Sequence, residues 1–164
     1  MLIIETIDEQ FLLILGLAGA KIKNPDSTLR DLRNAFPKAQ IQLMRADRIA
    51  GKEHLLMAAR NAVKAFRQGY QRSQSLGMEL LLYTACQRQI SKAIDLIGIG
   101  PRTGAVALVA VSPDKNTLEK LARTAAEMVR GRPNDDALEI DSNEKVAELK
   151  KVYNVTEREL EASS

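Results

Sequence analysis

Residues 75–99 constrain the fold more than any other part of this 164-residue chain, because a strongly apolar helical pattern is interrupted there only once. Apolar side chains recur at helical spacing before and after the interruption, so the segment predicts a pair of packed helices. The first set is Met78, Leu81, Leu82, Ala85 and Cys86, and the second is Ile90, Ala93, Ile94 and Ile97. Cys86 falls inside the first stripe, which favours a small residue in the core.

The interruption is the polar trio Gln87, Arg88 and Gln89. A guanidinium offers five donors in a planar fork, and two side-chain amides add both donors and acceptors. Such a cluster suits a phosphate, a base edge or a row of exposed carbonyls. Two interpretations stay open: the trio binds a ligand, or Arg88 and its neighbours cap the carbonyls of the first helix and tie the two helices together.

The remainder of the chain alternates predicted strands and helices. Strands are expected at residues 11–22, 40–44 and 105–111, the last a continuous apolar run that is typical of a buried central strand. Residues 137–140 suit a short edge strand. Helices are expected at residues 26–36 and 49–66, and another should begin with Ser112 as N-cap and Pro113 in its first turn and end at Gly131. A last helix follows Ser142.

These elements predict an α+β fold, in which a small mixed β-sheet packs against several α-helices. The length suits a single domain over residues 1–164, with the last ten or so residues frayed. One cysteine excludes an intrachain disulfide, and the single histidine leaves no Cys/His metal site, so we expect no metal and no cofactor. The one candidate membrane segment, residues 11–20, is shorter than the ~20 residues of a spanning helix. We therefore expect a soluble cytoplasmic protein without membrane contact.

Charge is distributed unevenly along the chain. Residues 1–110 hold 15 lysines and arginines against 9 acidic residues, whereas residues 111–164 hold 9 against 12. Most of the positive excess lies between residues 40 and 75. On a helix, Arg60, Lys64 and Arg67 would share one face, opposite an apolar face. This stripe is either a solvated surface or a contact for a polyanion.

Catalytic motifs are absent from the sequence pattern. The G-x-G-x-x-x-G run at residues 98–104 precedes a strand instead of opening a helix, so a turn is expected there and not a phosphate-binding loop. Glu79 is the one carboxylate in an apolar segment, and a partnership with Arg88 or with a backbone amide is favoured over acid/base work. We expect no enzyme activity. The alternative is a small enzyme with a site built on His54, Glu79 and Arg88.

Three stretches carry a family resemblance. Residues 75–99 read SLGMELLLYTACQRQISKAIDLIGI, residues 45–62 read RADRIAGKEHLLMAARNA, and residues 134–141 read NDDALEID. They resemble the TPRKB family, in which a small residue and M-E-[IL]-L are followed by a small residue, one or two polar residues, R-Q-I and A-I. Together the stretches span most of residues 41–145. Where relatives often carry a small pair such as Ser-Gly before the polar trio, this chain has Ala85 and Cys86.

The resemblance implies a non-catalytic regulatory subunit of the KEOPS complex, which installs threonylcarbamoyl groups on the adenosine beside the anticodon of certain tRNAs. It implies docking on the N-terminal lobe of that complex's small atypical kinase/ATPase, a PRPK-like protein, and stimulation of that kinase. It also implies binding of the 3′ CCA end of tRNA. Other KEOPS subunits would be contacted indirectly, and scaffolding without any RNA contact is a further possibility.

The expected RNA-binding residues are Lys52, His54, Ser75, Arg88 and Gln89. Lys52 and His54 lie at the start of the long basic helix, where free backbone amides and the positive end of the helix dipole favour an anion. Ser75 suits a helix cap, and Arg88 and Gln89 lie at the polar break. If the fold brings these residues together, they form one donor-rich site for the unpaired tail of a tRNA.

Overall fold

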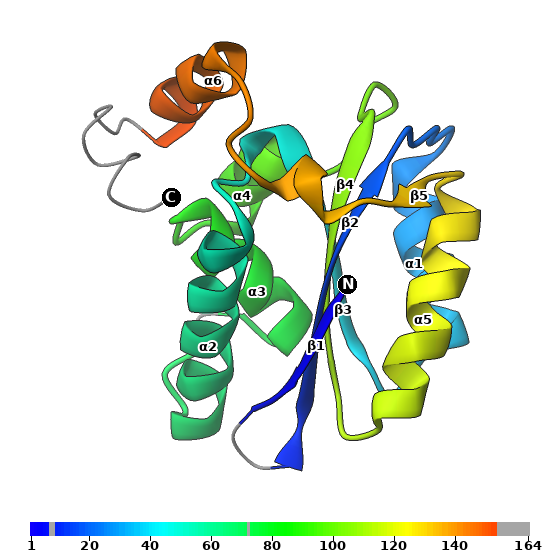
Figure 1. Ribbon diagram of the computed structural model, residues 1–164. Coiled ribbons are helices and arrows are strands. Elements are labelled where there is room, and N and C mark those ends of the chain that lie inside the picture. The colour runs from blue at the N-terminus through cyan, green and yellow to red at the C-terminus, as the bar shows by residue number, and fades with distance from the viewer. Residues whose placement is uncertain (7–8, 72, 154–164) are drawn as a thin grey trace.

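A computed structural model of the chain describes residues 1–6, 9–71 and 73–153 (Figure 1). The strands are β1 (Leu2–Glu5), β2 (Phe11–Ala18), β3 (Gln40–Arg45), β4 (Ala105–Ser112) and β5 (Arg132–Pro133). The helices are α1 (Pro25–Ala35), α2 (Lys52–Gln68), α3 (Leu76–Ala85), α4 (Ile90–Ile97), α5 (Lys115–Met128) and α6 (Asn143–Tyr153), with the short 3-10 helices η2 (Ala46–Arg48) and η3 (Asp135–Leu138). The predicted α+β class is confirmed, as is the helical pair on either side of the polar trio.

The sheet has the strand order β1-β2-β4-β3, and β5 also pairs with β2. Each of these pairings is antiparallel, so the prediction of a mixed sheet was wrong. The reason is visible between β3 and β4. Met44, near the end of β3, forms a bridge with Gly98, shortly before β4 begins. The three helices between these strands therefore return the chain to the end of the sheet at which it left, and β4 must run against β3.

Helices cover both faces of the sheet (Figure 1). Along β2, Leu12 and Ile14 pack with α2, α3 and α4, whereas Leu13 and Leu15 pack with α1 and α5. This alternation is the period of two that a strand imposes on its side chains. Because neither face meets water, β2 and β4 are nearly continuous apolar runs. No helix in the described part of the chain is long and apolar enough to cross a membrane.

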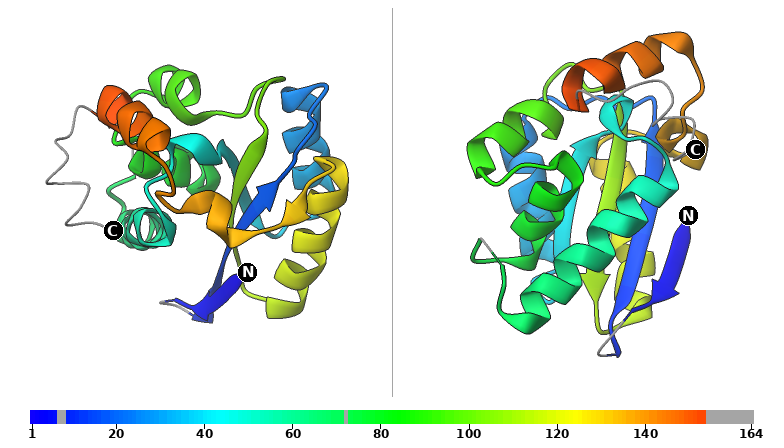
Figure 2. Two further views of the ribbon diagram at one scale, coloured as in Figure 1. Left: turned by 45° about the horizontal axis from the view of Figure 1, so that its top comes forward. Right: turned by 90° about the vertical axis from the view of Figure 1, so that its left-hand side faces the viewer.

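The two outer edges of the sheet differ in which other elements contact them. At β3, the guanidinium of Arg33 donates to the carbonyl of Ile41 at 3.1 Å, and the side-chain amide of Gln42 donates to the carbonyl of Gly77 at 3.2 Å. A Cβ at Gly77 would lie 3.0 Å from the Ile41 oxygen, so the start of α3 sits directly against this edge. Within the described residues, β1 pairs with β2 alone and forms the opposite edge (Figure 2).

Residues 137–140 do not form the predicted edge strand. The side chain of Asn134 accepts a hydrogen bond from the amide of Asp136 at 3.1 Å and turns the chain into η3. Leu138 is fully buried, and the place beside β2 is taken by β5. The expected fraying of the last ten residues lies outside the described residues.

The start of α5 also differs from the prediction. Ser112 is the last residue of β4, and the N-cap is Asp114, whose side chain accepts from the amide of Asn116 at 3.0 Å. Pro113 therefore precedes the cap and does not lie in the first turn. The sequence pattern did not predict β1 or β5.

Candidate nucleic-acid interface

His54, expected to bind RNA, connects its own helix α2 to α3 and α6. Its Nδ1 accepts from the amide of Ala50 at 3.0 Å, and its Nε2 donates to the carbonyl of Thr84, at the end of α3, at 2.8 Å. Its ring meets that of Tyr153 in α6 edge to face, with centroids 5.4 Å apart. These bonds require the neutral tautomer with hydrogen on Nε2. Burial lowers the pKa of His54, which also favours the neutral ring.

The first backbone amide of α2 is already occupied. The amide of Lys52 donates to Oε1 of Glu139 at 3.1 Å, so a carboxylate of the chain itself takes the place expected for an external anion. The Lys52 ammonium lies 3.6 Å from a carboxylate oxygen of Asp135. Lys52 therefore faces the η3 segment.

Ser75 is the N-cap of α3, as its position predicted. Its Oγ accepts from the amide of Met78 at 3.1 Å. In the same first turn, Glu79 is buried, and its carboxylate accepts from both the amide and the hydroxyl of Ser73. The expected backbone-amide partner of Glu79 is thus confirmed. The ten residues of α3 place Ser75 about 15 Å from the polar trio.

The backbone itself closes the end of α3. Cys86 adopts a left-handed conformation with φ 55° and ψ 40°. Its amide donates to the carbonyl of Tyr83 at 3.3 Å, and the amide of Gln87 donates to the carbonyl of Leu82 at 3.1 Å. The backbone therefore caps these carbonyls without help from the Arg88 side chain. The turn also carries Cys86 out of the core, so the prediction that it is buried was wrong.

The side chains that follow this turn point outward. Arg88 is exposed and, within the described residues, forms neither a hydrogen bond nor an ion pair. Gln89 is the N-cap residue of α4, but its side chain makes no capping bond. These two side chains keep their donors available for a ligand.

Arg88 lies at a hollow of about 410 Å³ between α2 and the end of α3. The residues that line it are Asn61, Glu79, Leu82, Tyr83, Cys86, Gln87 and Arg88. Asn61 and Tyr83 were not predicted, because the sequence does not show that the middle of α2 packs beside the end of α3. Of the five expected residues, Arg88 and Gln89 are adjacent, and His54 reaches their end of α3 through Thr84. Lys52 and Ser75 point elsewhere.

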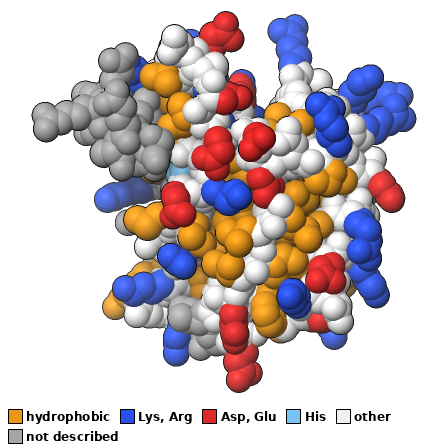
Figure 3. Space-filling model, in the orientation of Figure 1, with side chains coloured by type: hydrophobic (Ala, Val, Ile, Leu, Met, Phe, Trp, Pro, Cys, Tyr) orange, Lys and Arg blue, Asp and Glu red, His pale blue; other side chains and the backbone are white. Residues whose placement is uncertain are grey.

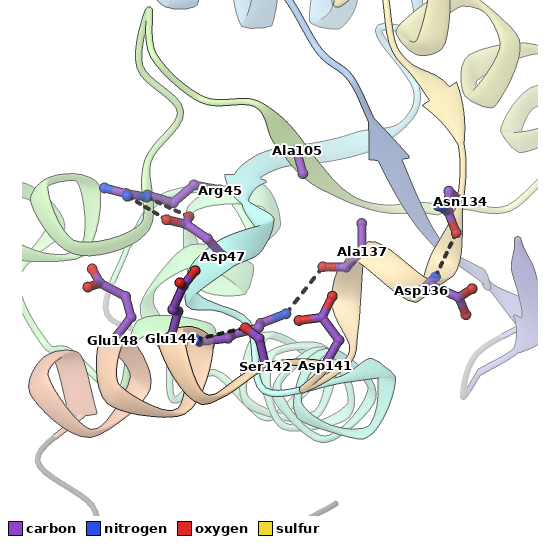
Figure 4. A pocket seen from close by; sticks show the side chains of 11 residues that line it. Arg45, Asp47, Ala105, Asn134, Asp136, Ala137, Asp141, Ser142, Glu144 and Glu148 are labelled. Atoms are coloured by element: carbon purple, nitrogen blue, oxygen red, sulfur yellow. Dashed lines mark hydrogen bonds and ion pairs between the residues drawn. The ribbon is translucent and has the colours of Figure 1, made fainter.

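A second hollow, of about 600 Å³, has the opposite character (Figure 4). Its acidic lining residues are Asp47, Asp136, Asp141, Glu144 and Glu148. Both of its cations are engaged: Arg45 donates to Asp47 at 2.8 and 2.7 Å, and the Lys145 ammonium donates to the carbonyls of Ala137 and Glu139 at 3.2 and 2.7 Å. The bond from Arg45 lowers the pKa of Asp47 and keeps it charged. This region, formed by η2, η3 and α6, disfavours a polyanion.

Comparison with known proteins places the chain among regulators. Residues 20–164 match the family described as "Kinase binding protein CGI-121". The "Regulatory protein Cgi121" of Methanocaldococcus jannaschii is 31% identical over 155 residues, which cover 92% of this chain and 93% of that protein. The match extends well beyond the three stretches that first suggested a kinase-binding relative. The chain belongs to the CGI-121 family of kinase-binding regulatory proteins.

Proposed function

We propose that this chain is a non-catalytic regulatory subunit of the KEOPS complex, which binds the complex's atypical kinase/ATPase and the 3′ CCA end of tRNA and so supports threonylcarbamoyl-adenosine formation. It would act in the cytoplasm. The match to the kinase-binding family over residues 20–164 carries this proposal. The likeness of residues 75–99 to the TPRKB subunits extends it from a kinase to KEOPS and tRNA.

Kinase binding is tested by mixing the purified chain with the KEOPS kinase at micromolar concentration and measuring co-elution. A stable contact of this kind would bury about 1,200 to 2,000 Å² in total. We expect a stoichiometric complex and a faster ATPase rate than the kinase shows alone. Separate elution at every concentration would contradict the proposal.

Arg88 supports the RNA part of the proposal, because it offers its donors at the rim of a hollow without an internal partner among the described residues. Arg88→Ala should weaken tRNA binding by about 1 to 3 kcal/mol, the range for a charged hydrogen bond, and leave kinase binding intact. Arg123→Ala, on α5 across the sheet, is the matched control and should bind as the wild type does. A tRNA without its terminal CCA should bind more weakly. Equal binding of both RNAs would contradict a site for the 3′ end, and failure to bind either RNA would leave scaffolding without RNA contact as the better description.

The enzyme alternative is less well supported by the geometry. Both ring nitrogens of His54 are engaged by backbone groups, and Glu79 is 1% exposed. Glu79 and Arg88 line one hollow, but His54 is not among its lining residues. We expect the purified chain alone to turn over no nucleotide. An ATPase activity that co-purifies with the chain and disappears in the Glu79→Gln variant would restore the enzyme alternative.

A further inference from the structure

We infer that the basic stripe of α2, formed by Arg60, Lys64 and Arg67, is a second RNA contact, which takes the backbone phosphates of the tRNA body beyond its 3′ tail. This inference rests on the proposed function. The three side chains are exposed, and their spacing of four and three residues places them on one face of α2. Figure 3 shows lysine and arginine side chains on both flanks of the molecule, over the α2 side and over the α5 side.

Within the described residues, two of the three cations of the stripe lack the ion pairs that other cations of the chain form. Arg45 is bonded to Asp47, and Arg48 to Glu148. Arg60 and Lys64, in contrast, form no hydrogen bond or ion pair with the residues that the structure describes. A solvated helix face is usually stabilised by opposite charges four residues apart, whereas like charges at this spacing destabilise the helix. The stripe therefore makes α2 less stable, which favours a role in binding.

The stripe is also in the right place to continue the proposed 3′-end site. Asn61, next to Arg60 in the chain, lines the hollow that contains Arg88. Arg60 and Lys64 line a hollow of about 390 Å³ on the other flank of α2, with Val63, Thr6 and the single carboxylate Glu5. An RNA strand that leaves Arg88 across Asn61 thus meets the stripe next.

The dimensions and the charge of the surrounding surface agree with this path. From Arg60 to Arg67 the helix rises about 10 Å. A nucleic-acid strand in a duplex carries one phosphate roughly every 3.4 Å along its axis, so this length can meet two or three phosphates. The acidic hollow formed by η2, η3 and α6 repels a polyanion from the other end of the molecule. A strand bound at Arg88 is therefore favoured to continue along α2 and not toward this acidic hollow.

The test measures the affinity of the full chain for a tRNA transcript, with and without its 3′ CCA, over a range of salt concentrations. The variant Arg60→Gln/Lys64→Gln removes two cations of the stripe. The matched control, Lys120→Gln/Arg123→Gln, removes one lysine and one arginine from the exposed face of α5, which packs on the opposite face of the sheet. Circular dichroism and co-elution with the kinase verify that both variants are folded.

We expect the stripe variant to bind both RNAs about tenfold more weakly at low salt, and the slope of log affinity against log salt to fall by about two contacts. The control should change neither quantity. An unchanged slope, or an equal loss of affinity in the control, overturns the proposal that the stripe contacts RNA. If removal of the CCA still weakens binding in that case, the proposed 3′-end site stands. If the wild-type chain binds neither RNA, the proposed function itself fails.

Discussion

At the scale of single residues, the junction of α3 and α4 depends on a cysteine in a conformation that glycine usually adopts. Cys86 has φ 55°, in the left-handed region where a Cβ costs about 1–2 kcal/mol. Helices commonly end with glycine in this position. Glycine has no Cβ and adopts this conformation without strain, so Cys86 makes the turn at a cost in stability.

Cys86→Gly should therefore stabilise the protein. We expect the free energy of unfolding in urea to rise by about 0.5–1 kcal/mol, because relief of the left-handed strain exceeds the extra chain entropy of glycine. Cys86→Ala keeps the Cβ and should give no such gain. An equal gain in both variants would show that loss of the thiol, and not of the strain, is responsible.

His54 predicts a pH dependence of stability. Its folded-state pKa is lowered, chiefly by burial, so the unfolded chain takes up a proton more readily than the folded one. The stabilisation that the neutral, buried His54 gives the folded state is therefore fully present above the ordinary pKa of about 6.5 and is lost as the pH falls below it. Between pH 7 and pH 5.5 the free energy of unfolding should fall by up to about 1 kcal/mol from this group.

His54→Gln provides the comparison, because the chain has no other histidine. The variant should be less stable at pH 7, since the bonds to Ala50 and Thr84 are weakened, but it should lack this component of the pH dependence. If wild type and variant lose stability in parallel between pH 7 and pH 5.5, another group is titrating. Denaturant unfolding at several pH values measures both slopes.

At the scale of the elements, β2 shows how closely the η3 segment approaches the sheet. The amide of Asn134 donates to the carbonyl of Gly16 at 2.8 Å, and the amide of Gly16 donates to Asp135 at 2.9 Å. A Cβ at Gly16 would lie 2.5 Å from the carbonyl oxygen of Asn134. This glycine lets η3 cross the strand directly.

Gly16→Ala should lower the free energy of unfolding by about 1–3 kcal/mol, because backbone must shift to admit the methyl group. Gly104→Ala is the control, since a Cβ there meets nothing within 4 Å. Its effect should stay within about 0.5 kcal/mol. Similar destabilisation of both variants in thermal unfolding would show that general strand or turn preferences dominate.

Patterns within one element predicted most of the fold. The apolar run of β4 and the helical stripes of α2 and α5 depend on local periodicity, and these elements were found within a few residues of their bounds. The errors arose where another element decides. Residues 137–140 do not form a strand because β5 takes the place beside β2. The strand β1 was missed because residues 6–10, which connect it to β2, contain no glycine to mark a turn.

At the scale of the whole molecule, the candidate site could be predicted only in part. Arg88 was conspicuous because it interrupts an apolar pattern, and the structure leaves its side chain exposed. The sequence could not show that Glu139 occupies the start of α2, since 87 residues separate Glu139 from Lys52. Nor could it show that Asn61 lies in the same hollow as Arg88. Both facts depend on how distant segments meet, and local spacing carries no information about that.

The unequal edges of the sheet limit how copies of this protein could associate. The β3 edge is blocked by Arg33 and the start of α3, whereas β1 pairs on one side only within the described chain. A strand-to-strand contact can therefore form at one edge per molecule. Two molecules joined through β1 would use up both available edges, so growth would stop at a closed pair. Edge-to-edge pairing of the folded molecules, as far as the described residues show, therefore ends at two copies as long as the start of α3 stays in place.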